Sequence, residues 1–578
     1  MRPYFEKMPV MGKELTDKAR ARSEDNARVV LEYEKQVEVA VRKVVDAGLP
    51  IEQIHKRGEL TAMERIEKLV DPGSFLPINS LFDPHFNEEG SVGIVSGLAT
   101  ISGRHCVLVA SDNKVLAGAW IPGQGEKIFR AQDMAQMMNV PLVWVLNCSG
   151  VKLTQQEEVY AGRRSGGHTF FRHSAMEIGG VPVLAAVFGT NPAGGGYHGI
   201  SPTRMYAHKD ANMAVGGAGI VSGMSPKGFF DVAGAMQIIE ATRHFKAVPP
   251  GGVRIHHDET GFFSTVHETE DEVLAQLRKA MAEMPRYEAS FFRVASPAEP
   301  LFPATDLPYL VPFDQKVTYK VEQFMARVFD GSEHFELRPD YGPEVYCGLA
   351  KVDGFLIGVI GNRQGFLGKD YPEYTKEYTG IGGKLYRQGL IKMNEMVSLC
   401  GRDKIPILWI QDTSGIDVGD IAERAELLGL GQSLIYSIED SRVPMICIVL
   451  RKGTAAAHYI MGGPQASRNN AFTLGTACTE IDVMHGETAS VAAFARRLVK
   501  EQDSGKPLEP VIDKMNALAR QYHDQSRPIY SAQRGYLDEV APFTRLRDYL
   551  IAFARCCYQN PRAICPLHQM MLPRIIKG

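Results

Sequence analysis

The chain repeats itself about 260 residues further on, and this repeat constrains the fold more than any other feature. LVDPGSF at 69–75 returns as VFDGSEHF at 328–335, and PLVWVLNCSGV at 141–151 returns as PILWIQDTSGI at 406–416. The separation is 259 residues between the aspartates of the first pair and 265 residues between the final residues of the second pair. Such steady spacing predicts two lobes of one fold rather than chance similarity between strands.

Each lobe alternates apolar strand candidates, such as VPLVWVLN and VPVLAAVFG, with helical stretches such as EKIFRAQDMAQMMN. This rhythm predicts an α/β fold. A helical pattern precedes it, and five prolines between residues 296 and 314 indicate a linker. We expect a helical N-terminal arm (1–58), a first lobe (59–295), a Pro-rich linker (296–316) and a second lobe (317–578).

Composition excludes several classes of protein. With 44% hydrophobic residues, 23% charged residues and a net charge of -3, the chain has no basic excess that would suggest nucleic acid. The N-terminus lacks a signal-peptide core, and no apolar run is long enough to span a membrane, so we expect a cytoplasmic protein. The nine cysteines suggest reduced thiols. Because no familiar zinc spacing is present, we predict no metal, even where cysteine and histidine gather near the C-terminus as Cys556, Cys557, Cys565 and His568.

The repeat also contains a candidate catalytic element. In each lobe one strand ends in a turn, NCSGV at 147–151 or DTSGI at 412–416, and another ends in tiny residues, GGG at 194–196 or AAA at 455–457. If the two turns lie side by side, backbone N–H groups converge near a helix N-terminus and form an oxyanion hole. A Cβ branch in the tiny-residue run would fill the volume that a carbonyl oxygen must occupy. Two such turns predict two holes.

Competing motifs are weaker. GGGYHG at 194–199 fits a dinucleotide-binding pattern but lies in the middle of a lobe, and neither a P-loop nor a nucleophile elbow is present. Cys148 could be a nucleophile, yet its repeat partner is Thr413, so a buried structural cysteine is favoured. Without an obvious acid and base pair, decarboxylation beside a thioester fits the holes. Several basic side chains could bind a substrate carboxylate or be solvated loop charges: Lys152, Arg163, Arg164, His256 and His257.

Longer motifs carry a family resemblance. RGELTAMERIEKLVDPGSF at 57–75, the strand-turn elements and RKGTAAAHYIMGG at 451–463 resemble the biotin-dependent acyl-CoA carboxyltransferases. In that family each half has a crotonase-like fold, a spiral of ββα units. Within it, SDNKVLAGAWIPGQ, TNPAGGGYH and ICPLHQMMLPR look like the α (carboxyltransferase) subunits of glutaconyl-CoA decarboxylases. Propionyl- and methylcrotonyl-type members tend to have Asp-Ser-Gly-Gly at 147–150 and Gly-Gly at 455–456, and this chain departs from both.

The resemblance implies a role for each lobe. The first lobe would bind the thioester and the second would bind biotin. The thioester oxygen would be held by Val151, Gly194 and Gly195, and the ureido oxygen of biotin by Ile416, Ala455 and Ala456. The CoA amide and adenine would be held by the small residues Ala117 and Ala119. The CoA phosphates would be contacted by the basic residues Lys114, Lys127 and Arg130.

The resemblance also implies partners. The chain lacks the Met-Lys-Met of a biotin carrier, so biotin would come on a separate subunit. The reaction would move the terminal carboxyl group of glutaconyl-CoA to biotin and give crotonyl-CoA, in glutamate fermentation. An integral membrane subunit would then export Na⁺, which places this chain at the inner face of the membrane, and a homodimer would share its active sites. The alternatives are another acyl-CoA carboxylase subunit, of propionyl- or methylcrotonyl-CoA type, and a non-catalytic CoA-binding scaffold.

Overall fold

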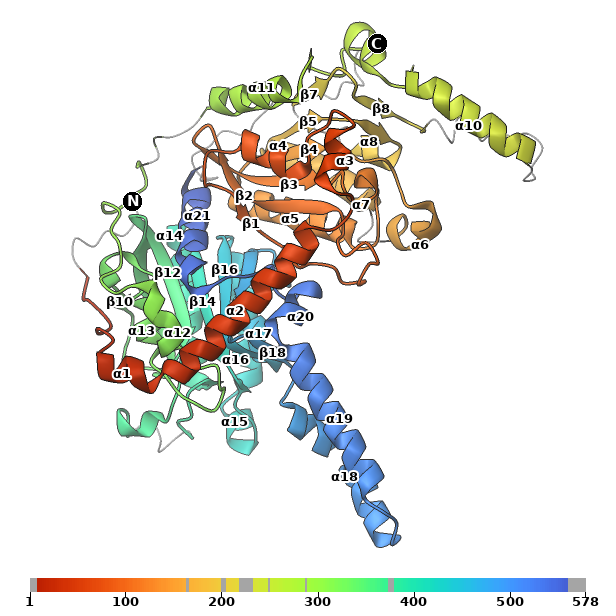
Figure 1. The fold of residues 1–578 in the computed structure, drawn as a ribbon. Helices are drawn as coiled ribbons and strands as arrows, with labels where there is room; N and C mark the ends of the chain where they lie inside the picture. Colours follow the sequence, from red (N-terminus) through yellow and green to blue (C-terminus); the bar gives the residue numbers. More distant parts are fainter. Residues whose placement is uncertain are drawn as a thin grey trace. The chain divides into compact units, whose positions relative to one another are not determined.

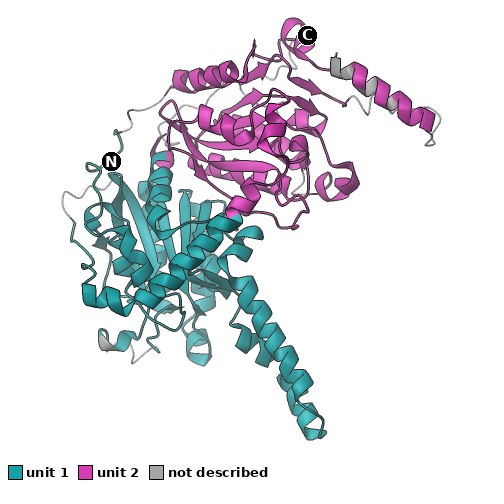
Figure 2. Ribbon diagram, viewed as in Figure 1, with its two compact units in different colours: residues 1–40, 290–555 teal, residues 41–289, 556–578 magenta. Residues whose placement is uncertain are grey.

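The computed structural model describes residues 8–162, 166–198, 204–217, 232–247, 250–285, 288, 290–372 and 379–559. The chain divides into two compact units, which are coloured separately in Figure 2. Unit 2 comprises residues 41–289 and 556–578 and contains the first lobe. Unit 1 comprises residues 1–40 and 290–555 and contains the second lobe. The domain boundaries expected from the sequence stay predictions.

The first lobe is built on a seven-stranded sheet in the order β1-β2-β3-β4-β5-β7-β9. The first three strands are antiparallel and the others are parallel. A separate pair, β6 with β8, lies beyond the end of β5 in the chain. The strands are β1 (Leu76–Pro77), β2 (Ile94–Ile101), β3 (Arg104–Ser111), β4 (Leu142–Leu146), β5 (Val183–Val187), β6 (Thr190–Pro192), β7 (Arg204–His208), β8 (Asn212–Ala214) and β9 (Thr265–His267).

Burial explains why these segments form central strands. Every residue of LVWVL in β4 and of VLAAV in β5 is buried, as expected for parallel strands covered on both faces. One face, which carries Val143 and Val145, packs against α4 and α11 in a single apolar cluster. The helices are α3 (Ile51–His55), α4 (Ala62–Leu69), α5 (Gln124–Met138), α6 (Gln156–Val159), α7 (Gly166–Ile178), α8 (Gly194–Tyr197), α10 (Val232–Ala247) and α11 (Glu270–Glu283).

The second lobe repeats this plan in an eight-stranded sheet. Its order is β10-β11-β12-β14-β16-β17-β19, and β18 adds to the end of β16. An antiparallel start again precedes parallel strands, so the sheet supports the predicted duplication. The strands are β10 (Phe335–Glu336), β11 (Val345–Val352), β12 (Phe355–Asn362), β13 (Lys384–Leu385), β14 (Ile407–Thr413), β15 (Gly415–Ile416), β16 (Met445–Thr454), β17 (Asn470–Gly475), β18 (Glu480–Asp482) and β19 (Glu539–Val540).

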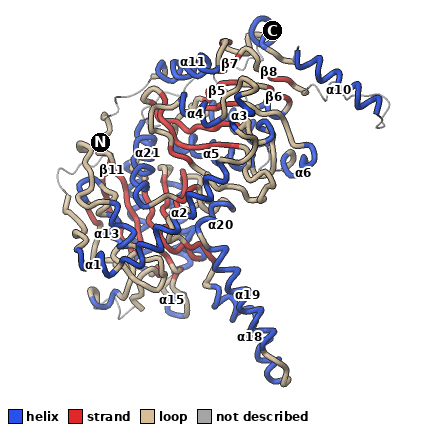
Figure 3. The backbone as a smooth tube through the Cα atoms, in the orientation of Figure 1, coloured by secondary structure: helices blue, strands red, loops and turns tan. Residues whose placement is uncertain are grey.

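Helices surround the sheet of each lobe, as Figure 3 shows by colour. In the second lobe α18 and α19 pair as a hairpin that extends away from the sheet (Figure 1). The helices of this part of the chain are α12 (Leu307–Leu310), α13 (Val321–Met325), α14 (Arg387–Asp403), α15 (Asp420–Arg424), α16 (Leu427–Ser441), α17 (Ala455–Ile460), α18 (Gly486–Asp503), α19 (Glu509–Ser526), α20 (Pro528–Gln533) and α21 (Leu546–Gln559).

The predicted helical N-terminal segment is present as α1 (Asp17–Arg22) and α2 (Glu24–Val45). The chain leaves α2 through Gly48, whose φ of 85° favours glycine. A Cβ at Gly48 would lie 2.4 Å from the Lys114 carbonyl oxygen, so the close approach also requires glycine. Among the helices of the described ranges, none is both long and apolar enough to cross a membrane.

Candidate active site

The end of β4 and the glycine run after β6 lie against each other in the first lobe. The Cys148 N–H donates to Asn191 Oδ1 at 2.8 Å. A Cβ added at Gly195 would lie only 2.5 Å from the Cys148 carbonyl oxygen. The side-by-side arrangement that an oxyanion hole needs is therefore present. The reason for the glycine differs from the expected one, because its Cβ would collide with this turn rather than with a ligand.

Backbone N–H groups at this contact are unused. Gly150, with φ of 102°, turns the chain after the strand, and its carbonyl oxygen accepts the Trp120 N–H at 2.7 Å. The Trp120 carbonyl oxygen accepts the Lys152 N–H at 2.9 Å, which leaves the N–H of Val151 between these two bonds. Within the described ranges, the N–H groups of Val151, Gly194 and Gly195 have no hydrogen-bond partner.

The second lobe has the same arrangement. Gly415, with φ of 124°, precedes Ile416, which pairs with Leu385 in the β13–β15 ladder. The flanking N–H of Asp417 donates to the Leu385 carbonyl oxygen at 3.1 Å. Considering only described residues, the N–H groups of Ile416, Ala456 and Ala457 are unpartnered. Two repeat-related sets of free N–H groups therefore exist, one in each lobe.

The structure corrects the alignment of the two tiny-residue runs by one position. Ala193 and Ala455 both have positive φ, 46° and 53°, and each directly follows a strand segment that pairs with β8 or β18. These two alanines are 262 residues apart, whereas the sequence comparison matched Gly194 with Ala455 at 261. Gly194 and Gly195 therefore correspond to Ala456 and Ala457.

Aromatic and imidazole rings support the glycine run of the first lobe. His198 follows α8 and stacks on Trp144 with ring centroids 4.9 Å apart. It also lies 4.6 Å from the Trp120 ring, and Trp144 Nε1 donates to His173 Nε2 at 3.0 Å. Burial lowers the pKa of His173 to about 3 and that of His198 well below its ordinary value. Both imidazoles are therefore neutral and act as packing rather than as acids.

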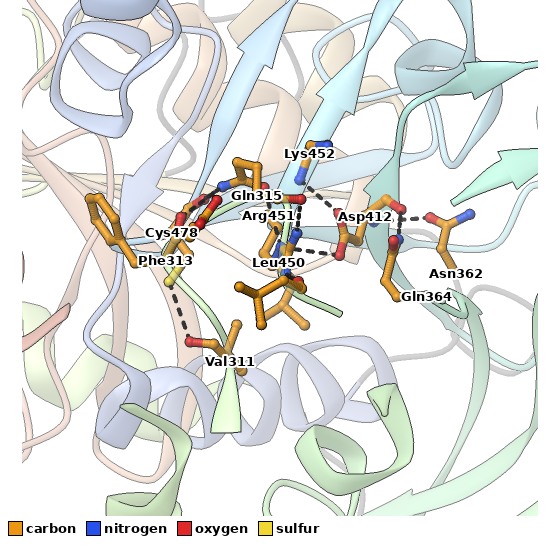
Figure 4. A network of polar contacts seen from close by, with 12 residues as sticks. Val311, Phe313, Gln315, Asn362, Gln364, Asp412, Leu450, Arg451, Lys452 and Cys478 are labelled. Carbon is orange, nitrogen blue, oxygen red and sulfur yellow. Dashed lines mark hydrogen bonds and ion pairs between the residues drawn. The ribbon is translucent and has the colours of Figure 1, made fainter. Parts of the chain in front are cut away.

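A buried polar network supports the turn of the second lobe (Figure 4). Asp412 Oδ1 accepts the Lys452 N–H at 3.2 Å, and Asp412 Oδ2 lies 3.4 Å from Arg451 Nε. The Asp412 N–H donates to Asn362 Oδ1 at 2.9 Å, and its carbonyl oxygen accepts from Gln364 Nε2 at 2.6 Å. Burial raises the pKa of Asp412, although the Arg451 charge opposes that rise. The network joins the ends of β12, β14 and β16.

The two lobes differ in charge at this point. Asp412 corresponds to Asn147, 265 residues earlier, and Arg451 corresponds to Gly189, 262 residues earlier. A Cβ at Gly189 would lie 2.6 Å from Asn147 Oδ1. A buried ion pair in the second lobe is thus replaced by an amide and a glycine in the first.

The residues predicted to contact CoA differ in burial. Lys114 is 6% exposed, and its ammonium donates to the Val45 carbonyl oxygen at the end of α2, where a cation is favourable. Lys127 is 3% exposed. Phosphate contacts by these two lysines stay predictions. Arg130 is half-buried, Ala117 has φ of 54° and Ala119 is buried next to Trp120.

The remaining candidate residues from the sequence are a cysteine, several histidines and arginines, and the cysteines and histidine near the C-terminus. Cys148 is buried, and burial raises its pKa to about 12, so it is no thiolate nucleophile. His256 Nε2 contacts the Met213 carbonyl oxygen at 2.6 Å. No group of metal ligands occurs among the residues that the structure describes. Arg163, Arg164, Cys565 and His568 lie outside the described residues.

Sequence reasoning named Lys152 as a possible carboxylate ligand, but it missed two ion pairs beside the turns. Lys152 Nζ lies 2.6 Å from Glu89 Oε1 in the first lobe. Lys384 Nζ lies 2.8 Å from Asp417 Oδ1 in the second lobe. The 265-residue offset, applied one residue beyond Val151 and Ile416, pairs Lys152 with Asp417 and would have drawn attention to Asp417.

Comparison with known proteins places the chain in a family. Residues 53–571 match the family model described as carboxyl transferase domain. The chain is 53% identical over 576 residues to glutaconyl-CoA decarboxylase subunit alpha of Acidaminococcus fermentans, covering 99% of this chain and 97% of that one. It is 28% identical to the biotin-dependent 3-methylcrotonyl-coenzyme A carboxylase beta1 subunit of Mycobacterium tuberculosis, covering 84% and 86%.

A solved structure shows the same fold. The beta subunit of geranyl-CoA carboxylase from P. aeruginosa superposes with a TM-score of 0.77 at 23% identity, covering 98% of this chain and 100% of that one. The predicted α/β, crotonase-like fold with a helical N-terminal segment is confirmed. The chain belongs to the carboxyl transferase domain family.

Proposed function

We propose that this chain is the carboxyltransferase subunit of a biotin-dependent, sodium-pumping glutaconyl-CoA decarboxylase. The 53% identity over nearly the whole length of such a subunit carries the proposal. The repeat-related free N–H groups support it. The reaction places negative charge on the thioester oxygen, and it also needs a second set of donors for the ureido oxygen of biotin.

The first lobe would stabilise the charge that develops on the substrate. When the terminal C–C bond of glutaconyl-CoA breaks, CO2 leaves and the electron pair moves through the double bond to the thioester oxygen. The N–H of Val151 and those of Gly194 and Gly195 are the donors for this oxygen. Loss of one such donor costs on the order of 3 kcal/mol in other enzymes, so these groups would lower the barrier substantially.

The second lobe fits the ureido group of biotin. The N–H groups of Ile416, Ala456 and Ala457 would take the places assigned from the sequence to Ile416, Ala455 and Ala456. Ala456 is exposed and its methyl side chain leaves room for a ring. Biotin supplies the ring nitrogen that takes up the carboxyl group. These N–H groups would hold its ureido oxygen and fix the direction of that nitrogen.

The partners follow from the same proposal. A carrier subunit would bring the biotin, and an integral membrane subunit would use the carboxyl group to export Na⁺ during glutamate fermentation. This chain would then lie at the inner face of the membrane through its complex. A homodimer would form each active site from the first lobe of one chain and the second lobe of the other, since repeated lobes favour a pseudo-twofold arrangement.

A substrate panel tests the function. With free biotin as the carboxyl acceptor, the purified chain is expected to convert glutaconyl-CoA to crotonyl-CoA and to act poorly on methylmalonyl-CoA and 3-methylglutaconyl-CoA, the carboxylated forms of propionyl-CoA and methylcrotonyl-CoA. Preference for either of the latter would favour an acyl-CoA carboxylase subunit, for which the 28% identity to a methylcrotonyl-type chain is the supporting observation. Binding of CoA esters without turnover would indicate a non-catalytic scaffold.

The isolated chain is expected to carry no covalent biotin. Lys392, one of the lysines next to a methionine, is buried in α14 and donates to the Val345 carbonyl oxygen at 3.1 Å. Lys514 lies within the helix α19 and therefore does not belong to an exposed turn. An avidin blot of the purified protein should show no signal, and stoichiometric label on this chain would contradict the separate carrier.

A further inference from the structure

We propose that Lys152 binds the terminal carboxylate of the acyl group, and that the Lys384–Asp417 ion pair closes the equivalent space beside the biotin site. The inference rests on the proposed function and deepens it, because it assigns the group that distinguishes a dicarboxylic acyl-CoA from its decarboxylated product. It also gives a reason, within this chain, why the two repeat-related sites take different ligands.

Lys152 is placed next to the first-lobe N–H groups by the backbone. It directly follows Val151, and its own N–H is fixed by the Trp120 carbonyl oxygen at 2.9 Å. Its side chain is 26% exposed and its ammonium lies 2.6 Å from Glu89 Oε1. An ammonium has three donors, and among described groups Glu89 takes one of them. The remaining donors are available to an anion.

The repeat shows what the same positions hold in the second lobe. At the 265-residue offset, Lys152 corresponds to Asp417 and Ala119 corresponds to Lys384. The backbone equivalence is independent of side chains, because Trp120 bridges to Val151 as Leu385 pairs with Ile416. In the second lobe the two side chains satisfy each other at 2.8 Å.

This difference changes which ligand each site accepts. In the second lobe Lys384 fills the position and neutralises Asp417, which suits an uncharged ureido ring. In the first lobe the equivalent of Lys384 is Ala119, whose side chain ends at Cβ. Ala119 therefore offers Lys152 no charged partner. Its partner is Glu89, which comes from the loop before β2. A ligand carboxylate can therefore share the ammonium beside the thioester site.

The anion recognised is the acyl carboxylate rather than a CoA phosphate. The phosphates are separated from the thioester by the whole pantetheine arm, whereas the terminal carboxylate of glutaconyl-CoA lies only a few bonds from it. Lys152 neighbours a residue assigned to the thioester oxygen. Hydrogen bonds to a charged group are the stronger ones, so loss of the ammonium should weaken carboxylate recognition selectively.

Two matched ligands isolate this contact. Glutaryl-CoA and butyryl-CoA differ only in the terminal carboxylate, and neither contains the double bond used in the reaction. Calorimetry on the full chain should show that Lys152→Met lowers the affinity for glutaryl-CoA about tenfold and the affinity for butyryl-CoA less than about twofold. Lys152→Arg should retain most of the affinity for glutaryl-CoA. Lys209→Met, which removes an exposed lysine paired with Glu268 at 2.9 Å, should change neither affinity.

A second variant tests the opposite direction. Glu89→Gln removes the competing carboxylate, so glutaryl-CoA should bind a few-fold more tightly while butyryl-CoA is unchanged. Equal loss for both ligands in Lys152→Met, or no loss for either, would overturn the assignment while leaving the proposed function intact. Failure of the wild-type chain to bind either CoA ester would instead overturn the proposed function, and the assignment with it.

Discussion

Gly195→Ala is expected to lower kcat for decarboxylation of glutaconyl-CoA by about 10² to 10³. Its Cβ would lie 2.5 Å from the Cys148 carbonyl oxygen, which is a backbone atom in the turn that leads to Val151. Relief of this collision must move the turn away from the glycine run. The free N–H groups of Val151 and Gly195 would then no longer point at one oxygen. Formation of crotonyl-CoA, measured with free biotin as the carboxyl acceptor, reports the loss.

Gly194→Ala is the matched control. Its Cβ would lie 3.6 Å from Trp120 Cζ3, an ordinary van der Waals contact, and the N–H remains. The same added methyl group should therefore cost less than about tenfold in kcat. Thermal melting of both variants separates local displacement from global unfolding. Near-normal kcat for Gly195→Ala, with native-like melting, would show that the oxyanion site is placed wrongly.

Two inactive variants are expected to restore each other in a mixed dimer. Gly195→Val damages the first lobe, and Ala456→Val adds a branched side chain at an exposed position beside the free N–H groups of the second lobe. If each site combines the first lobe of one chain with the second lobe of its partner, a mixed dimer has one site with both lesions and one with neither. Random pairing of equal amounts should then recover about a quarter of wild-type activity.

The measurement needs verified exchange of subunits. Chains carrying two different affinity tags, purified over both tags in turn, give mixed dimers directly, and these should show about half of wild-type activity. Mixing Gly195→Val with Gly195→Ala should recover nothing, because every site keeps a first-lobe lesion. Absence of recovery in doubly purified mixed dimers would mean that both parts of a site belong to one chain.

The repeat made the layout of both lobes predictable, because matched strand sequences form matched sheets. It left the register of the tiny-residue runs one position wrong. The chain takes 42 residues from Val151 to Ala193 but 39 from Ile416 to Ala455. Runs of glycine and alanine contain no larger side chain that would fix their alignment. Only the positive φ of Ala193 and Ala455 and the strands before them show which residues correspond.

Charged residues were harder to assign from the sequence. Lys114 satisfies the Val45 carbonyl oxygen, a backbone group 69 residues earlier in the chain that leaves no trace in the sequence. The sequence around a lysine does not show whether its ammonium lies in solvent or contacts the end of a helix. Lys152 had a clearer signal, since the aligned position in the other lobe carries the opposite charge at Asp417.

The burial of Cys148 gives this enzyme an internal reporter. Its thiol lies in the turn that contacts Gly195, is fully enclosed and stays protonated at neutral pH, so alkylating reagents reach it only when the turn opens. The rate of its modification therefore measures how often the first-lobe turn separates from the glycine run. An acyl-CoA ligand that holds the two together should slow labelling at this one cysteine, which makes occupancy of the site readable by mass spectrometry without turnover.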